Sequence, residues 1–472
     1  MKNIEKNEEI SMGIILGNRG FFADELCKKA RAELLPQLEN MGIKPVILPE
    51  EENVYGSIET RSDARKCAQL FNQHKDEIKG IIVSLPNFGD EKAAAQTLRM
   101  TEVDVPVLVH AFPDDVGKMD YENRRDSFCG KISVCNNLRQ YGIDYTLTEM
   151  HNEDPASESF KKDIEKFKGI CRVVDVLNGA RVGIIGPRPA DFNTVRYSEK
   201  LLEYNNISVE PIGVIDIVEE IDTDREEVQN EVEKLKNYMD TSEVDEEPLR
   251  KMAGFSLAVN NWIEQNDLDT AAIQCWDALQ KHLGINPCAV MSYLSNSNLP
   301  AACESDVMGA LSMLALQAAS TEPSALADWN NNFGDNPEQA VLFHCGNFAS
   351  DMYTECKMKY AEILGSTLGE ENTQGAVYGM LQPGDITFAR LSTDDTQGKI
   401  KAYVAEGEIF EEDLKINGSW GAVRVPELQD LLQYICNNGF EHHVGINLSA
   451  VSDILAEAFA NYMGWEVYNH NN

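Results

Sequence analysis

Two carboxylates and a histidine pair are the side chains of this sequence best suited to bind a metal ion. Glu304 follows three small residues, which is typical of a carboxylate at the end of a buried strand, and Asp328 lies in a second apolar segment. His442 and His443 form the only adjacent histidine pair. Oxygen ligands with one imidazole suit Mn²⁺ or Mg²⁺ and leave positions open for the oxygens of a substrate. Taken singly, each carboxylate could equally be a helix cap or a solvated group.

Composition restricts the partners of this chain. The sequence has 78 Asp and Glu against 41 Lys and Arg, a net charge of −37, which argues against nucleic acid and anionic membranes. It has no apolar run of about 18 residues, so we expect no membrane span. The start of the sequence lacks the apolar core of a signal peptide, and none of the eleven cysteines forms a Cys-x-x-Cys pair. These features predict a cytoplasmic protein with reduced thiols and no cysteine zinc site.

The first part of the chain alternates strands with helices. We expect strands at 10–17, 42–49, 80–86 and 105–110, and helices at 24–41 and 64–79. This rhythm predicts a parallel sheet whose ligands meet the loops at the carboxyl ends of the strands. Arg19 and Phe88 lie on such loops. The segment 17–20 is too short for a dinucleotide fingerprint and there is no Walker A motif, which disfavours a nucleotide cofactor.

The later parts predict two further domains. We expect an N-terminal α/β domain over 1–170, a central α/β domain over 171–355 that carries both carboxylates, and a β-rich domain over 356–472 that carries the histidines. Short strands with turn signals after about residue 355 are typical of antiparallel, barrel-like structure. The predicted fold is thus two Rossmann-like parallel-sheet α/β domains followed by a smaller antiparallel β-barrel-like domain.

With this order, the whole chain resembles the L-fucose isomerase and L-arabinose isomerase superfamily, in its fucose-isomerase-like branch. The segment Ala302-Cys-Glu304-Ser-Asp306 is similar to that family's Ala-x-Glu-x-Asp metal motif, and Asp328 stands at the spacing of its second carboxylate ligand. The segment 439–444 resembles its C-terminal His-His segment, and 17–20 resembles its N-terminal arginine loop. The chain is shorter than typical fucose isomerases, mainly in its C-terminal part. The loops that select the sugar are therefore the part of the family pattern that applies least to this chain.

The resemblance implies a metal-dependent aldose–ketose isomerase that acts through an ene-diol, with Glu304 and Asp328 as acid and base. It implies Mn²⁺, or Mg²⁺ or Co²⁺, held by Glu304, Asp328 and His443, with His442 as the weaker choice for the histidine. His344 stands where the arabinose branch has a further ligand, and it is either that ligand or a core histidine. The resemblance also implies a homo-oligomer, most simply a hexamer, whose sites are completed by a neighbouring subunit.

The substrate stays open at this point. Fucose- and arabinose-type sugars are the family's usual substrates, and an anionic hexose of the sulfoquinovose type is possible if Arg19 or Arg188 lies in the pocket. For the far end of the sugar we expect Arg19, Phe88, Gln274 and Trp420 to bind, although Trp420 could instead pack between domains. The alternative function is a non-catalytic sugar-binding protein of the same architecture.

Overall fold

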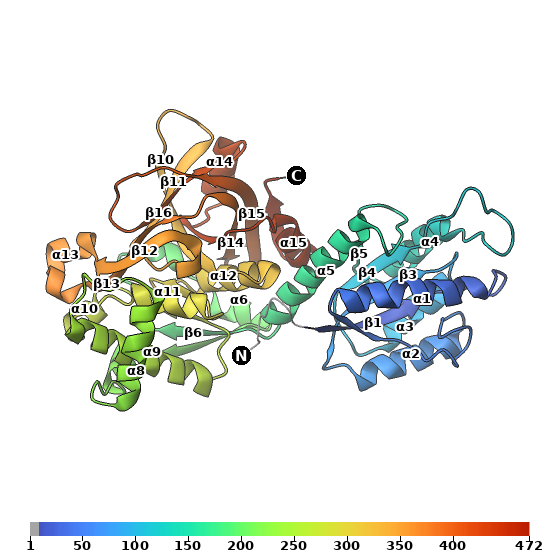
Figure 1. Cartoon of the computed structure of the whole chain (residues 1–472), viewed down its shortest axis with the longest axis horizontal. Coiled ribbons are helices and arrows are strands. Elements are labelled where there is room, and N and C mark those ends of the chain that lie inside the picture. The colour runs from blue at the N-terminus through green and yellow to red at the C-terminus, as the bar shows by residue number, and fades with distance from the viewer. Residues whose placement is uncertain (1–8, 472) are drawn as a thin grey trace. The chain divides into compact units, whose positions relative to one another are not determined.

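The computed structural model describes residues 9–471, which form two compact units (Figure 1). The N-terminal unit contains residues 9–175 with 461–464, and the C-terminal unit contains 176–460 with 465–471. Among the described helices, none combines the length and the apolar character that a bilayer span requires.

The N-terminal unit is built on a five-stranded parallel sheet in the order β2-β1-β3-β4-β5. Helices α2, α3 and α4 share one apolar core with the sheet, and helices α1 and α5 share a second. The sheet is therefore covered on both faces, as parallel sheets require. Its elements are β1 (Ile10–Leu16), α1 (Glu25–Asn40), β2 (Ile43–Val46), α2 (Arg61–Gln73), β3 (Ile78–Leu85), α3 (Glu91–Met100), β4 (Val107–Ala111), α4 (Ser127–Gln140), β5 (Thr146–Leu147) and α5 (Glu158–Leu177).

The C-terminal unit begins with a four-stranded parallel sheet in the order β7-β6-β8-β9. Its strands are short, β6, β8 and β9 are buried almost throughout, and polar residues of the site follow the carboxyl ends of β8 and β9. Its strands and the helices that precede residue 300 are β6 (Arg181–Ile185), α6 (Glu199–Tyr204), β7 (Ser208–Ile212), α7 (Val214–Glu219), α8 (Glu226–Tyr238), α9 (Glu246–Gln265), β8 (Thr270–Ile273), α10 (Ala278–His282), α11 (Cys288–Asn296) and β9 (Ala301–Cys303).

A closed antiparallel barrel of six strands forms the rest of this unit. The pairing runs β16-β11-β10-β17-β14-β15 and returns from β15 to β16. This confirms the predicted fold class, and β12, β13 and β18 extend the same sheet. The strands are β10 (Ser324–Asn332), β11 (Gln339–His344), β12 (Tyr353–Tyr360), β13 (Gln374–Leu381), β14 (Gly384–Asp394), β15 (Lys399–Phe410), β16 (Ser419–Arg424), β17 (His443–Asn447) and β18 (Glu466–Asn469).

Helix α12 (Val307–Ser320) joins the parallel sheet to the barrel. It packs against β8 and β9 on one side and against β10, β14 and β17 on the other. Almost every residue of the helix is buried. The helix is apolar on all of its faces, as is typical of an internal helix. Helix α15 (Ser452–Glu457) packs against α12 and β14, and the remaining helices are α13 (Glu362–Leu368) and α14 (Leu428–Asn437). Strands β10 and β11 precede residue 355 and yet belong to the barrel, so Asp328 stands on a barrel strand and not in the α/β sheet.

Candidate metal centre

Glu304 is presented by a strained turn between β9 and α12. Glu304 and Ser305 both have positive φ angles, 57° and 55°, a conformation that non-glycine residues adopt rarely and that concentrates at functional sites. The Ser305 hydroxyl donates to the backbone oxygen of Gly186 at 3.1 Å, which fixes the turn to the end of β6. The Trp276 indole N–H donates to Glu304 Oε1 at 3.0 Å. Only the second carboxylate oxygen, Oε2, is left free.

Asp328 and His443 are brought to the same place by strand pairing. They are direct partners across the antiparallel pair β10–β17. His443 Nε2 lies 2.8 Å from Glu304 Oε2 and 3.5 Å from Asp328 Oδ1. The structure therefore brings together the three residues for which the sequence predicts metal binding.

Two buried carboxylate oxygens at this point are without hydrogen bonds. Among the described residues, neither Glu304 Oε2 nor Asp328 Oδ1 has a hydrogen-bond partner, and the ion-pair approach of His443 to Glu304 does not have hydrogen-bond geometry. Unpaired buried carboxylate oxygens are costly unless a cation compensates them. Two such oxygens that converge on one imidazole nitrogen fit a divalent ion of the Mn²⁺ or Mg²⁺ type.

Asp306 orients His443 for this role. His443 Nδ1–H donates to Asp306 Oδ2 at 2.8 Å, which leaves Nε2 to face Glu304 and Asp328. Burial lowers the pKa of His443, but Asp306 and Glu304 outweigh burial and raise it to about 10. Burial raises the pKa of Glu304, but His344 and His443 hold it well below its usual range. A proton and a divalent cation would therefore compete for His443 Nε2.

A fully buried arginine holds Asp306 in place. Arg390 donates to both carboxylate oxygens of Asp306, at 2.6 and 3.0 Å, and through Nε to Glu441 at 3.1 Å. The Ser392 hydroxyl donates to the other oxygen of Glu441 at 2.9 Å. Every charge in this chain of contacts is paired, as buried ions require. The sequence offered no signal for Arg390, because it stands in the middle of an ordinary strand.

The other two histidines near the site are placed differently. His344 Nε2 lies 3.2 Å from Cys303 Sγ and 3.8 Å from Glu304 Oε2. The backbone N–H of Cys345 donates to His344 Nδ1, so neutral His344 carries its proton on Nε2. Among the described residues, His344 also belongs to both side-chain groups that could hold a metal ion, Cys303–Glu304–His344 and Asp328–His344–His443. His442 Nε2 lies 3.5 Å from Asp328 Oδ1, and its side chain is 44% exposed.

Two aromatic side chains not singled out as site residues in the sequence border the centre. Trp276 follows Gln274 at the end of β8 and holds Glu304, as described above. Phe192, in the loop after β6, has its ring centroid 5.5 Å from that of His443 and 5.4 Å from that of His442. An apolar ring in this position limits the access of water to the histidines.

The predicted sugar-binding residues lie in three places. Arg19 and Phe88 meet in the N-terminal unit, where the guanidinium lies 4.3 Å from the centre of the Phe88 ring, donates to the Gly89 carbonyl and pairs with Glu91. Gln274 lies at the carboxyl end of β8, on the same edge of the sheet as Glu304. Trp420 lines a different cavity, of about 870 Å³, that includes none of the three predicted metal ligands.

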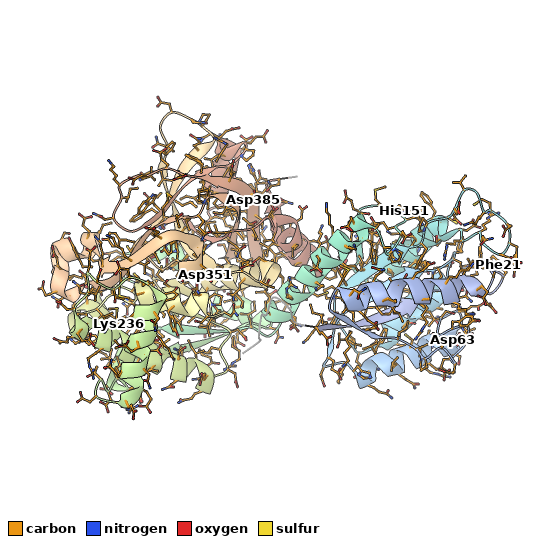
Figure 2. All side chains as sticks on the ribbon, viewed as in Figure 1. Phe21, Asp63, His151, Lys236, Asp351 and Asp385 are labelled. Atoms are coloured by element: carbon orange, nitrogen blue, oxygen red, sulfur yellow. The ribbon has the colours of Figure 1, made fainter. Side chains whose placement is uncertain are left out.

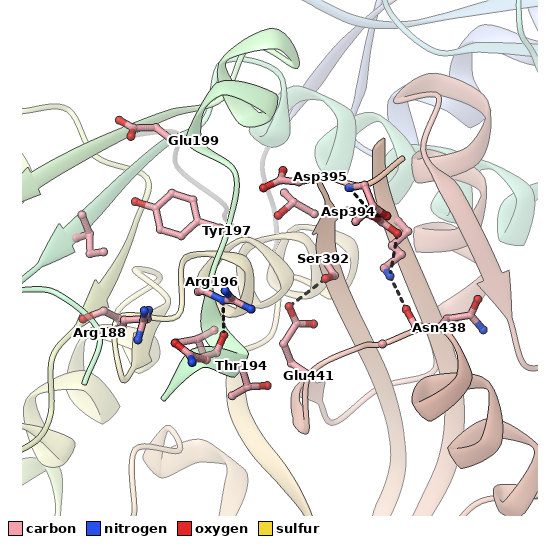
Figure 3. A pocket seen from close by; sticks show the side chains of 18 of the residues that line it. Arg188, Thr194, Arg196, Tyr197, Glu199, Ser392, Asp394, Asp395, Asn438 and Glu441 are labelled. Atoms are coloured by element: carbon pink, nitrogen blue, oxygen red, sulfur yellow. Dashed lines mark hydrogen bonds and ion pairs between the residues drawn. The ribbon is translucent and has the colours of Figure 1, made fainter. Parts of the chain in front are cut away.

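Two cavities of the C-terminal unit border the centre. One of about 300 Å³ is lined by Glu304, His344, Trp276, three cysteines and aliphatic groups. The other, of about 890 Å³, is lined by Ser305 and Glu441 and by the loop after β6, including Arg188 and Arg196 (Figure 3). Of the three predicted metal ligands, Glu304 lines the first cavity and none lines the second, which approaches the centre through Ser305 and Glu441.

Comparison with known proteins gives the family. Residues 13–178 match the model of the fucose/sulfoquinovose isomerase N-terminal domain, and residues 342–471 match that of the L-fucose isomerase C-terminal domain. This chain belongs to the fucose-isomerase-like family. The sulfoquinovose isomerase of Priestia megaterium is 22% identical over 393 residues, which cover 81% of this chain and 84% of the relative. That of Alkalicoccus urumqiensis is 23% identical over 355 residues, or 72% and 75% of the two chains.

Membership in the fucose-isomerase-like family decides between the two functions predicted from the sequence. The relatives are enzymes, so this chain is an aldose–ketose isomerase acting on a sugar and not a non-catalytic binding protein.

Proposed function

We propose that this isomerase requires a divalent cation, most simply Mn²⁺ with Mg²⁺ or Co²⁺ as substitutes, and that Glu304, Asp328 and His443 bind it. The observation that carries the proposal is the convergence of two unpartnered buried carboxylate oxygens on His443 Nε2. When bound, such a cation polarises the substrate carbonyl and stabilises the negative charge that develops on the sugar oxygens.

The protons are moved by the carboxylates. Glu304 and Asp328 act as base and acid on the sugar: one removes the proton from C2 of the aldose to give an ene-diol, and a proton is returned to C1 of the ketose. The low pKa of Glu304 keeps it ionised and able to accept a proton. Trp276 holds Glu304 Oε1, so the free Oε2 is the oxygen that meets the substrate. Phe192 packs against the buried His443 and limits the access of water to that imidazole.

Sulfoquinovose is the substrate we propose, because the curated relatives carry that name and span most of this chain. Its sulfonate distinguishes it from neutral fucose- and arabinose-type sugars, which we expect to be poorer substrates. We retain Gln274 as a side chain that binds the sugar, since it shares the sheet edge with Glu304. Trp420 lines another cavity, which favours the alternative role of packing.

We propose further that the enzyme is a homo-oligomer, a hexamer in its simplest form. Arg19 and Phe88 would then complete the site of a neighbouring subunit. Nine exposed large apolar side chains of the N-terminal unit support an interface there; they include Phe21, Val116, Met119, Tyr121 and Phe128. All eleven cysteines are free, which is consistent with a cytoplasmic location.

Metal removal and replacement test the chemistry. EDTA should abolish conversion of sulfoquinovose to its ketose, followed by NMR, and Mn²⁺ should restore it. In D₂O the product should carry deuterium at C1, as an ene-diol requires and a hydride shift does not.

Glu304→Gln and Asp328→Asn should each reduce kcat by about 100-fold or more. Glu338→Gln, which changes an exposed carboxylate in a barrel loop, is the matched control. Full activity of metal-stripped protein would refute the proposal.

A further inference from the structure

We propose that Arg188 and Arg196 bind the anionic group of the substrate, in the 890 Å³ cavity beside the metal centre. This inference rests on the proposed function and assigns the part of the site that selects a sulfonated sugar. The two arginines would bind an oxyanion with several equivalent oxygens, and both a sulfonate and a phosphate are of this class. The sulfonate is the form that the relatives favour.

The cavity is lined by sequence neighbours of the proposed ligands and not by the ligands themselves. Ser305, which directly follows Glu304, lines it, and so does Glu441, two residues before His443. The loop after β6 touches both places, because Phe192 packs against His443 while Arg188 and Arg196 line the cavity. A sugar whose first two carbons lie at Glu304 can therefore extend its other end towards this loop. Figure 3 shows the two arginines on one wall of the cavity and Ser392 and Glu441 on another.

The two arginines are not neutralised by carboxylates. Arg188 donates to the carbonyls of Pro189 and Ala190, and Arg196 donates to that of Asn193, all within their own loop. Among the described residues, neither guanidinium forms an ion pair with a carboxylate. In a chain with 78 acidic residues, two unpaired arginines that line one cavity are a specific arrangement.

Two of the four acidic residues that line the cavity are paired with other cations. Glu441 pairs with Arg390, and Asp394 lies 3.6 Å from Lys401. Glu199 and Asp395 remain, and they balance the charge of the empty cavity. Backbone carbonyls already hold both guanidinium groups. The arginine side chains therefore lose little conformational entropy when an oxyanion binds.

The other candidates for binding an anion are weaker. Arg19 is paired with Glu91, so its charge is already compensated. The 300 Å³ cavity is lined by no lysine or arginine. Arg390 is fully buried and shared by two carboxylates. Guanidinium groups bind sulfonate and phosphate through two parallel N–H donors, which the two loop arginines can supply.

The test compares three substrates in four proteins. The substrates are sulfoquinovose, its neutral 6-deoxy analogue quinovose, and glucose 6-phosphate. The proteins are the wild type, Arg188→Met, Arg196→Met and the double variant. Arg225→Met, which removes an exposed arginine of the same unit, is the control, and Arg188→Lys tests whether charge alone suffices.

We expect each single substitution to raise KM for sulfoquinovose about 10- to 100-fold, the loss of one charge-assisted contact, and the double variant to lose more. KM for quinovose and Mn²⁺ affinity, read by electron paramagnetic resonance, should not change. A comparable effect on glucose 6-phosphate would identify a general oxyanion site, whereas an effect on sulfoquinovose alone would identify a sulfonate site.

An unchanged KM for sulfoquinovose in the double variant would overturn the inference, and so would an equal loss for quinovose. If the wild type isomerises none of the three sugars, the proposed function fails instead. Calorimetric binding of sulfoquinovose to the wild type and the double variant then decides the inference independently.

Discussion

At the scale of single residues, the two buried histidines beside the carboxylates differ in tautomer. His443 gives its Nδ1 proton to Asp306 and turns Nε2 towards two free carboxylate oxygens. His344 accepts a backbone N–H at Nδ1 and so keeps a proton on Nε2. A histidine's position in the sequence does not determine its tautomer, which depends on the partner of its other ring nitrogen.

Asp306→Asn should therefore weaken metal binding without touching a ligand. The amide cannot hold His443 in the same tautomer as firmly, and we expect Mn²⁺ affinity to fall about 10- to 100-fold. Nitrogen NMR of the histidine rings reports the tautomer directly. Glu441→Gln is the matched control, because it removes the other carboxylate of Arg390 but does not touch His443. Equal loss of Mn²⁺ affinity in both variants would mean that the network acts only on stability.

A buried histidine of the N-terminal unit predicts an acid-sensitive fold. His110 on β4 is fully buried, with Nδ1 2.9 Å from Ser84 Oγ and Nε2 2.9 Å from the Glu153 carbonyl oxygen. Burial lowers its pKa to about 3. Between about pH 6.5 and pH 3 the unfolded state thus binds more protons than the folded state, so stability falls as the pH falls. The full effect is about 5 kcal/mol at pH 3.

Hydrogen exchange of the β4 amides should show this loss, and His110→Gln should flatten the pH dependence. Tryptophan fluorescence is unsuited to the experiment, since all five tryptophans lie at or beyond residue 262, outside the N-terminal unit. A pH dependence that is the same in the variant would contradict the assignment.

At the scale of elements, α12 and the strand pair β10–β17 build the centre. The internal helix α12 places Asp306 at its N-terminus, where the carboxylate also accepts the backbone N–H of Gly309. The pair β10–β17 sets Asp328 opposite His443. Side chains lie on all elements of the C-terminal unit (Figure 2), and those of the centre come from α12, β10 and β17.

Gly309→Ala should lower stability, although alanine normally favours a helix by about 1 kcal/mol. A Cβ at this position would lie 2.6 Å from Asp306 Oδ2 and 2.9 Å from Leu326. The buried carboxylate cannot move away without losing Arg390. We expect a lower Tm and weaker Mn²⁺ binding together. Gly365→Ala on α13, where the Cβ would approach the mobile rim of Tyr360 at 3.1 Å, is the milder control. A raised Tm in Gly309→Ala would contradict this account.

At the scale of the whole molecule, the N-terminal unit carries the exposed apolar surface and the C-terminal unit carries the chemistry. Phe128 is 58% exposed near the N-terminus of α4, and Tyr121 is 68% exposed in the preceding loop. We expect Phe128→Asp to dissociate the oligomer, as measured by light scattering, and to reduce activity with Mn²⁺ affinity retained. Ile215→Asp, which changes an exposed apolar residue of α7 in the C-terminal unit, is the control. A fully active monomer would contradict completion of the site by a neighbouring subunit.

The sequence by itself determined much of this protein. Local periodicity gave the parallel sheets, the buried helix after Glu304 and the barrel-like strands, because these patterns depend on neighbours along the chain. The motif around Glu304, with Asp328 and the histidine pair, predicted the residues that the structure brings together. The sequence also predicted that Arg19 and Phe88 lie on loops at the carboxyl ends of strands.

Tertiary structure alone decided the rest. The barrel includes β10 and β11, which the sequence placed with the α/β domain, because closure depends on pairing between strands about a hundred residues apart. The same closure brings Arg390 to Asp306 and Glu441 to Arg390, across separations of 84 and 51 residues. Trp420 faces another cavity because strand register, and not composition, sets the side of a sheet on which a residue lies.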